Sequence, residues 1–143
     1  MASVDVSVSS QLEPDQAWAL ASNLDRFEEW LTIFGGWKSV VPDDIEVGTA
    51  VSSLIKVKGF RNVIHWQVTE YDAPKRIALD GSGRGGVRIT LTMTVTDRSP
   101  GSTFHLVANL RGALLNGPIG SLVAKVLQSD VRRSVENLAT LRS

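Results

Sequence analysis

The strongest constraint in this sequence is a change in the spacing of its apolar residues near residue 112. Before that point, apolar and polar residues alternate along 87–95 and 104–110, which is typical of strands with one buried face. From residue 118 to 141, apolar residues recur in steps of three and four, which indicates an amphipathic helix. A helix of about two dozen residues extends more than about 30 Å, so it could cross a whole sheet.

The segments before this point predict further strands and two short helices. Strands are expected near residues 4–8, 48–58, 60–71 and 76–80, and the short turns between them favour an antiparallel sheet of six or seven strands. Pro14 suits the first turn of a helix that continues to about Leu24. Asp25 and Glu28 resemble a capping box that opens a second helix. Residues 32–44 are predicted to be irregular, because they contain Gly35-Gly36 and Pro42-Asp43-Asp44.

Composition narrows the class of protein. The chain has 143 residues, the usual size of one domain, so we expect a single domain over 1–143. Fifteen basic residues balance fifteen acidic ones, which argues against a nucleic-acid partner. No cysteine is present, and neither a signal peptide nor an 18-residue apolar run is found, so we expect a cytoplasmic protein without a membrane span.

The order of the predicted elements resembles the START-like helix-grip superfamily (SRPBCC), which includes the polyketide cyclase/dehydrase and lipid transport proteins. It also resembles small actinobacterial members, some of which are labelled toxins of type II toxin–antitoxin pairs. The resemblance implies an α+β fold in which a curved antiparallel sheet grips the long C-terminal helix. The segments that carry it are Glu13-Pro14-Asp15-Gln16-Ala17-Trp18, Asp25-Arg26-Phe27-Glu28-Glu29-Trp30, Trp66-Gln67-Val68-Thr69-Glu70-Tyr71-Asp72-Ala73-Pro74-Lys75-Arg76 and the helix over 118–141.

This resemblance also implies a cavity between the concave face of the sheet and the last helix, closed by the regions 30–37 and 112–117. Members of the superfamily bind lipids, sterols or polyketides, and a minority catalyse reactions. We therefore expect an internal site for a small hydrophobic ligand such as a fatty acid, lipid or polyketide. The side chains predicted to line it are Trp30, Phe34, Trp37, Trp66, Leu91, Phe104, Leu106, Leu115, Leu122 and Val126.

The aromatic residues of this set have two interpretations. They could simply fill the core, since each large ring brings about 150–250 Å² of surface that must be buried. Phe34 and Trp37, however, flank Gly35-Gly36, and glycine beside bulky apolar side chains is what a movable gate at a cavity mouth requires. Both interpretations remain open at this point, and the gate is the one that predicts a function.

Other motifs predict no chemistry. Gly81-Ser82-Gly83-Arg84-Gly85-Gly86 matches G-x-G-x-x-G, but a strand rather than a helix is expected to follow, so a dinucleotide site is not predicted. His65 and His105 lack a carboxylate at the spacing of a metal site. We therefore predict no catalytic residue, no metal ion and no cofactor.

Three functions are consistent with these patterns. The first is binding or transport of a hydrophobic ligand without catalysis. The second is a toxin-like or regulatory protein that acts through a protein partner. The third is a polyketide cyclase or dehydratase in which His65, Asn109 or a carboxylate moves a proton. The sequence makes no prediction of the oligomeric state.

Overall fold

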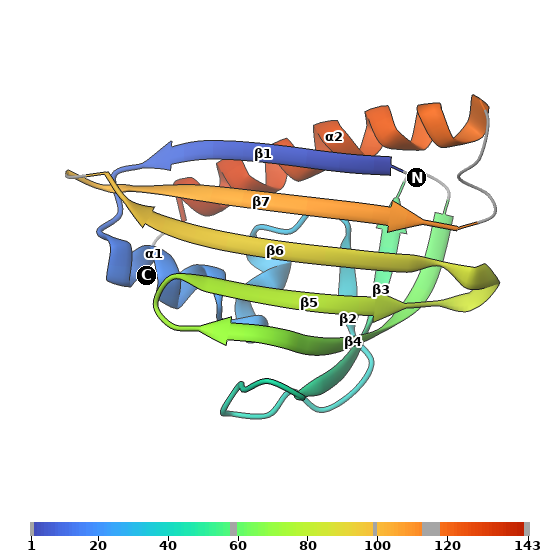
Figure 1. Ribbon diagram of the computed structural model, residues 1–143, viewed down its shortest axis with the longest axis horizontal. Coiled ribbons are helices and arrows are strands. Elements are labelled where there is room, and N and C mark those ends of the chain that lie inside the picture. The colour runs from blue at the N-terminus through green and yellow to red at the C-terminus, as the bar shows by residue number, and fades with distance from the viewer. Residues whose placement is uncertain (1, 58–59, 99, 113–117, 142–143) are drawn as a thin grey trace.

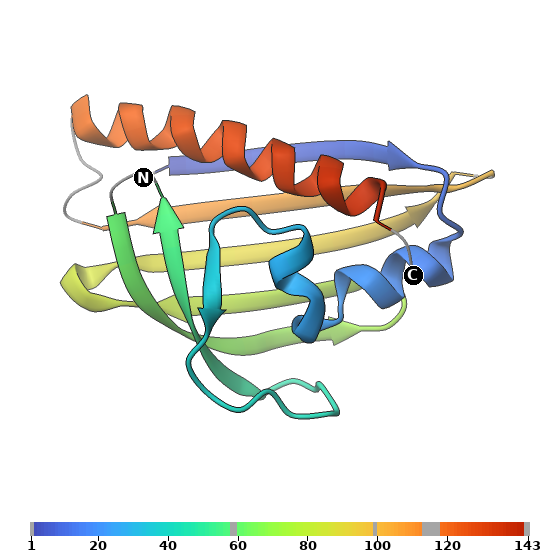
Figure 2. The same cartoon turned by 180° about the vertical axis from the view of Figure 1, so that it is seen from behind.

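The computed structural model describes residues 2–57, 60–98, 100–112 and 118–141. It contains one seven-stranded antiparallel sheet with the strand order β1-β7-β6-β5-β4-β3-β2. The sheet curls into a half-barrel, and helix α2 crosses its concave side (Figures 1 and 2). The predicted α+β helix-grip architecture is thereby confirmed. The strands are β1 (Ala2–Ser10), β2 (Phe34–Trp37), β3 (Ala50–Val57), β4 (Phe60–Asp72), β5 (Arg76–Ser82), β6 (Arg88–Asp97) and β7 (Ser102–Arg111).

The first and last strands lie side by side. β1 pairs with β7 along its whole length, so that Val4 faces Ala108 and Val6 faces Leu106 across the ladder. These side chains are 0–3% exposed, while their neighbours Ser3 and Asp5 are exposed. The alternation seen in the sequence therefore separates a packed concave face from a solvated convex face.

Four helical segments connect or cover the strands: α1 (Pro14–Ala21), the short 3-10 helices η1 (Leu24–Glu29) and η2 (Arg84–Gly86), and α2 (Pro118–Ala139). The predicted cap at Asp25 is wrong. Asn23 precedes η1, and its side-chain oxygen accepts a hydrogen bond from the Asp25 backbone N–H at 3.1 Å. The helix therefore starts two residues earlier, because the Asn23 side chain satisfies an N–H group of the first turn.

The region predicted to be irregular contains β2, which forms one edge of the sheet. Phe34 pairs with Ile55 and Trp37 with Ser53, and the register shifts between these two pairs. Gly36 takes a φ of +113°, which L residues rarely adopt. A Cβ on Gly35 would lie 3.0 Å from the Leu54 side chain. The two glycines thus permit a bulged strand that runs close to β3.

The described side chains of helix α2, from Lys125 onward, attach the helix to the rest of the protein. Leu127, Val131, Val135 and Leu138 are at most 4% exposed and belong to the hydrophobic core. Ser134 Oγ accepts a hydrogen bond from the Thr32 backbone N–H at 2.9 Å, and the Ala139 carbonyl accepts one from Ser10 Oγ at 2.7 Å. In the described part of the chain, no helix combines the length and the apolar character that a membrane span requires.

The glycine-rich segment after β5 forms η2, in which Gly85 and Gly86 have φ values of +76° and +73°. The next element is β6, which pairs antiparallel with β5. No helix of useful length follows the motif, so the reason for excluding a dinucleotide site holds. The predicted turn at residues 58–59 lies outside the described residues.

Candidate ligand cavity on the concave face

A small cavity of about 10 Å³ lies between the centre of the sheet and the segment formed by η1 and β2. It is about large enough for one water molecule. Its wall is apolar except for one serine hydroxyl and the indole N–H groups. The lining residues are Phe27, Leu31, Phe34, Trp37, Ser53, Ile55, Trp66, Leu79 and Leu91.

The strand register brings the floor of the cavity together. Leu79 of β5 is directly opposite Leu91 of β6, and Trp66 of β4 is opposite Gly81 of β5. A Cβ at Gly81 would lie only 2.7 Å from Trp66 Cε3 and 2.6 Å from Ile64 Cγ2. The absence of a side chain at Gly81 therefore leaves room for the Trp66 ring against the concave face of β5.

A hydrogen bond fixes the Trp66 indole in this position. Its Nε1–H donates to Ser53 Oγ on the neighbouring strand β3 at 2.8 Å. Trp66 is 6% exposed and Ser53 is 1% exposed, so both polar atoms are removed from water. This pair supplies the polar atoms in the described wall of the cavity. The other described lining residues have apolar side chains, apart from Trp37, whose N–H group donates to a backbone carbonyl.

Four rings, which we call the aromatic cluster, lie on the other side of the cavity. Phe27, Phe34 and Trp37 line it, and Trp30 packs against Phe27 behind them. Phe34 and Trp37 have ring centroids 4.9 Å apart, and Phe27 contacts both of them as well as Trp30 in tilted or edge-to-face geometries. Trp37 Nε1–H donates to the Leu24 carbonyl at 2.9 Å. The Trp30 Nε1–H is buried and has no hydrogen-bond partner among the described residues.

Exposure of the lining residues is uneven. Phe34 and Trp37 are partly exposed, whereas the other lining side chains are buried. β2 is therefore the part of the wall nearest to solvent. Two further inward-facing residues, Ile89 and Leu110, are also partly exposed, and they pair with each other across β6 and β7. The next inward-facing pair, Leu91 and Ala108, is buried. Apolar surface is thus incompletely covered beside the cavity.

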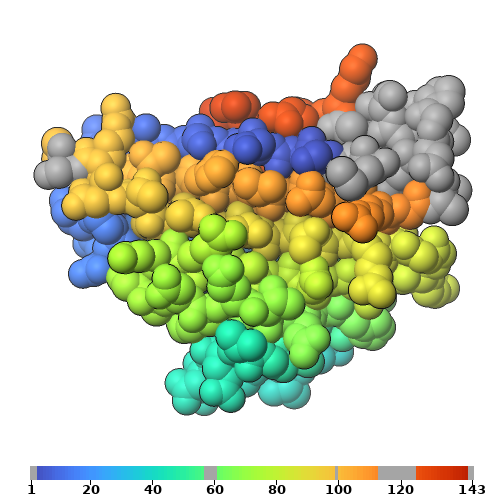
Figure 3. Space-filling view, viewed as in Figure 1, coloured from blue at the N-terminus to red at the C-terminus, as the bar shows by residue number. Residues whose placement is uncertain are grey.

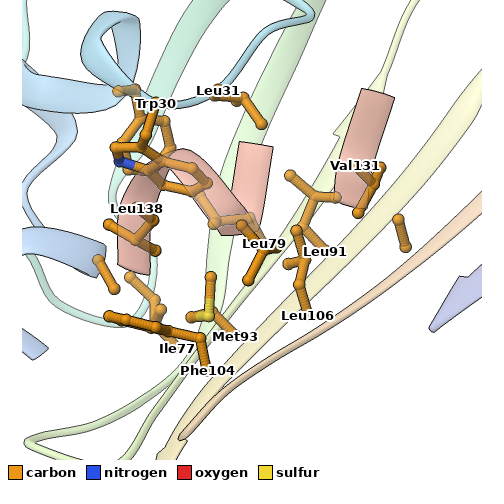
Figure 4. Packing of buried hydrophobic residues seen from close by; sticks show 14 of the residues in the cluster. Trp30, Leu31, Ile77, Leu79, Leu91, Met93, Phe104, Leu106, Val131 and Leu138 are labelled. Atoms are coloured by element: carbon orange, nitrogen blue, oxygen red, sulfur yellow. The ribbon is translucent and has the colours of Figure 1, made fainter. Parts of the chain in front are cut away.

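The structure brings part of the predicted set together. Phe34, Trp37, Trp66 and Leu91 line the cavity. Trp30 is 4% exposed and stacks edge-on against Phe27 behind this wall. Phe104 and Leu106 are 0% and 3% exposed, and they belong to the packed core together with Ile77 and Met93 (Figure 4).

The three remaining predicted residues belong to the chain from Leu115 onward. Val126 of α2 is partly buried against the core and is not among the residues that line this cavity. Leu115 and the side chain of Leu122 lie outside the described residues.

Five lining residues did not appear in the predicted set: Phe27, Leu31, Ser53, Ile55 and Leu79. The sequence did contain a pattern that could have identified two of them, Ser53 and Ile55 of β3. Val51, Ser53 and Ile55 alternate on one face, so a serine at the centre of an apolar face was visible in the sequence. The role of Gly81 depends on the register of β4 against β5, which no local pattern reveals.

Charged and titratable side chains named as candidates for chemistry point away from the cavity. His65 Nδ1 hydrogen bonds with Ser52 Oγ at 2.8 Å, and His105 Nε2 with Asp5 Oδ1 at 2.6 Å, both on the solvated side. Asn109 Oδ1 accepts from Ser3 Oγ there. No group of three or more His, Asp or Glu side chains suited to a metal ion is found within the described ranges.

The adjacent carboxylates of η1 are likewise on the surface. Arg26 Nε donates to Glu29 Oε2 at 2.6 Å, and this hydrogen bond lowers the pKa of the Glu29 carboxyl. The Glu29 side chain is 42% exposed, so the pair is an ordinary surface ion pair rather than an acid–base site.

Comparison with known proteins gives a consistent result. The profile of the family described as polyketide cyclase/dehydrase and lipid transport matches residues 1–141. A protein named toxin Rv0910, from Mycobacterium tuberculosis H37Rv, is 40% identical over 141 residues, covering 99% of this chain and 98% of that protein. The uncharacterised protein Rv1546 of the same strain is 37% identical over 141 residues, with 99% of each chain covered.

A solved structure shows the same fold at much lower identity. The crystal structure of TTHA0849 from Thermus thermophilus superimposes with a TM-score of 0.78 at 17% identity. The superposition covers 96% of this chain and 94% of that one. The half-barrel and the long helix across it are therefore shared, whereas identity at this level says nothing about the ligand.

Proposed function

Because the chain belongs to the polyketide cyclase/dehydrase and lipid transport family, we propose that it binds a small hydrophobic ligand on the concave face of its sheet, without catalysis. The ligand classes we propose are a fatty acid, a lipid or a polyketide. One observation carries the proposal: the apolar cavity reaches toward solvent only at Phe34 and Trp37, among its described lining residues, and these lie on a glycine-containing edge strand.

The cavity must enlarge to hold such a ligand. Ligand sites usually measure about 300–1,000 Å³, whereas this cavity measures about 10 Å³. We assign the structure to the closed state, in which the aromatic cluster occupies the space that a ligand would take. Rings that leave the wall would lose contact with one another and regain it against the ligand, so that binding exchanges one apolar contact for another.

β2 is the element best placed to move. It is a four-residue edge strand that pairs only with β3, and its register is already broken between Phe34 and Trp37. Few backbone hydrogen bonds therefore resist its displacement, and Gly36 can absorb a change in backbone angles. We assign Phe34 the role of gate, because Trp37 is additionally held by its hydrogen bond to Leu24.

The test is a binding titration with medium-chain fatty acids, fatty alcohols, ketones and an aromatic polyketide, followed by tryptophan fluorescence and by native mass spectrometry. We expect saturable binding of at least one class with one ligand per chain. Phe34→Ala is expected to raise the association rate about tenfold, because the gate loses its ring. Val40→Ala, a change at a side chain that is 89% exposed, is the matched control. Absence of binding by every class would refute the proposal.

A second candidate function is recognition of a protein partner, and one surface feature favours it. The segment between β2 and β3 projects from the molecule, where Figure 1 shows it as a loop and Figure 3 as a protruding ridge. Val40 and Val47 on this segment are 89% and 61% exposed, and Asp43, Asp44 and Glu46 are also on it. A relative at 40% identity bears the name toxin, which makes an antitoxin-like partner the natural class.

This candidate is tested by co-purification with the product of the neighbouring gene. Val40→Asp combined with Val47→Asp is expected to abolish the complex, whereas Phe34→Ala is expected to leave it intact. A complex that survives the double substitution would remove this segment from consideration. We extend neither proposal to catalysis, since His65 and Asn109 make their hydrogen bonds on the convex side.

A further inference from the structure

The Ser53 hydroxyl gives the proposed ligand a chemical character. Resting on the proposed function, we infer that the ligand is an uncharged amphiphile, an alcohol, ketone or ester, whose oxygen accepts a hydrogen bond from Ser53 inside the cavity. A free carboxylate is not the preferred ligand. The inference depends on three properties of the site: a spare proton, the absence of charge, and the position of Ser53 at one side of an apolar wall.

The first property is the spare proton. A serine hydroxyl has one proton to donate and two lone pairs to accept with. Trp66 Nε1–H occupies one lone pair at 2.8 Å. Among the described residues, the Ser53 hydroxyl donates no hydrogen bond, although the side chain is only 1% exposed. The indole thus fixes the hydroxyl oxygen while its proton stays available on the wall of the cavity.

The second property is the absence of charge. None of the described residues that line the cavity is Asp, Glu, Lys, Arg or His. The sequence of residues 113–124 likewise contains no charged residue, so that segment of the chain has none to offer. A carboxylate brought into such surroundings would lose its hydration without a counter-ion, which is far more costly than the burial of a neutral oxygen that accepts one hydrogen bond.

The third property is position. Ser53 pairs with Trp37 on one side and with Ile64 on the other, near the edge of the sheet. Leu79 and Leu91 line the cavity from β5 and β6, further toward the middle of the sheet. A ligand with one oxygen at its end would place that atom at Ser53 and extend its alkyl part over the two leucines. Affinity would then come from the alkyl part and orientation from the oxygen.

The experiment compares three probes of equal chain length at neutral pH: 2-octanone, octane and octanoate. Headspace partitioning measures the affinity of the first two, and calorimetry that of octanoate. The preference is the ratio of the 2-octanone affinity to the octane affinity, and its value in wild-type protein is the reference for the variants, since a ketone and an alkane differ in hydration. Octanoate is expected to bind at least about tenfold more weakly than 2-octanone.

Two variants assign the preference to Ser53. Ser53→Ala is expected to lower this preference about tenfold, the effect of one buried hydrogen bond, while the affinity for octane changes less than about twofold. Val40→Ala, a change at a side chain that is 89% exposed and outside the cavity lining, is the control and is expected to retain the preference. If Ser53→Ala does not fold, as near-UV circular dichroism would reveal, the combination with Trp66→Phe removes donor and acceptor together and serves in its place.

The outcomes separate the two proposals. If wild-type protein binds none of the probes and none of the wider ligand panel, the proposed function fails. If the preference is the same in Ser53→Ala as in wild-type protein, ligand binding stands and the anchoring role of Ser53 is overturned. Octanoate binding as tightly as 2-octanone would overturn the assignment to uncharged ligands.

Discussion

Trp30 and Trp66 are two buried indoles that differ in one respect. Trp66 donates its N–H to Ser53, whereas the Trp30 N–H has no partner among the described residues. A buried polar group without a hydrogen bond costs about 1–3 kcal/mol, and a satisfied one contributes about 1 kcal/mol. The same chemical group therefore has opposite effects on stability at the two positions.

This difference predicts the result of a matched pair of substitutions. Trp30→Phe and Trp66→Phe remove the same atoms, but the first deletes an unpaired donor and the second leaves Ser53 without its partner. We expect Trp66→Phe to lower the free energy of unfolding by about 1–2 kcal/mol more than Trp30→Phe. Urea denaturation followed by circular dichroism measures both, and equal losses would contradict the assignment.

For single residues, the sequence predicted which side chains face inward but not which of them line the cavity. Apolar spacing identified Trp66 and Leu91 as inward-facing, and the structure places both on the cavity wall. The same spacing selected Phe104 and Leu106, which face inward but are closely packed in the core. Alternation reports the face of a strand, not the depth of space above it, so cavity residues and core residues on one face look alike in the sequence.

At the scale of elements, the contact between α2 and the residues before β2 determines how the helix is held. Ser134 is 0% exposed and links the two, because its Oγ accepts from the Thr32 N–H at 2.9 Å and donates to the Asp130 carbonyl at 2.8 Å. Thr32 Oγ1 also lies 3.1 Å from Ser134 Oγ. This hydroxyl is thus the tie between the helix and the wall that carries the aromatic cluster.

Ser134→Ala should therefore destabilise the protein by about 1–3 kcal/mol, since it leaves the Thr32 N–H without an acceptor in a partly buried position. Thr140→Ala is the control, because Thr140 is exposed directly after the same helix and its hydroxyl makes only local hydrogen bonds. We expect the control to change stability by less than about 0.5 kcal/mol. Thermal unfolding of both variants at one scan rate distinguishes them, and a similar shift in each would argue against the tie.

Most elements could be predicted from the sequence because their hydrophobic period is clean, as in β6, β7 and α2. β2 could not, since two of its four residues are glycines and neither contributes to an alternating pattern. It is a strand because β3 offers a free edge to it, and that is a tertiary effect. The cap at Asn23 was missed for another reason. Asp25 and Glu28 have the residue types and the spacing of a capping box, so the sequence favoured Asp25 over Asn23 as the cap.

For the whole molecule, the position of the described titratable side chains outside the cavity predicts how the affinity for the ligand responds to pH. His65 and His105, the two histidines, make their hydrogen bonds on the convex side, and no titratable side chain lines the described cavity. The affinity for 2-octanone should therefore stay constant within about twofold between about pH 5 and pH 8. Calorimetric titrations across this range provide the check. A tenfold change would indicate a titrating group beside the ligand.

The pairing of β1 with β7 has a consequence for how the chain acquires its structure. Ser3 pairs with Asn109, which lies 106 positions later in the chain. Contacts so distant in sequence require a large loop to close, which slows folding. On the ribosome, Val4 and Val6 must wait for most of the chain to emerge. A growing polypeptide thus carries an unpaired apolar leading strand for most of its synthesis, and chaperones that shield exposed strands would act in that interval.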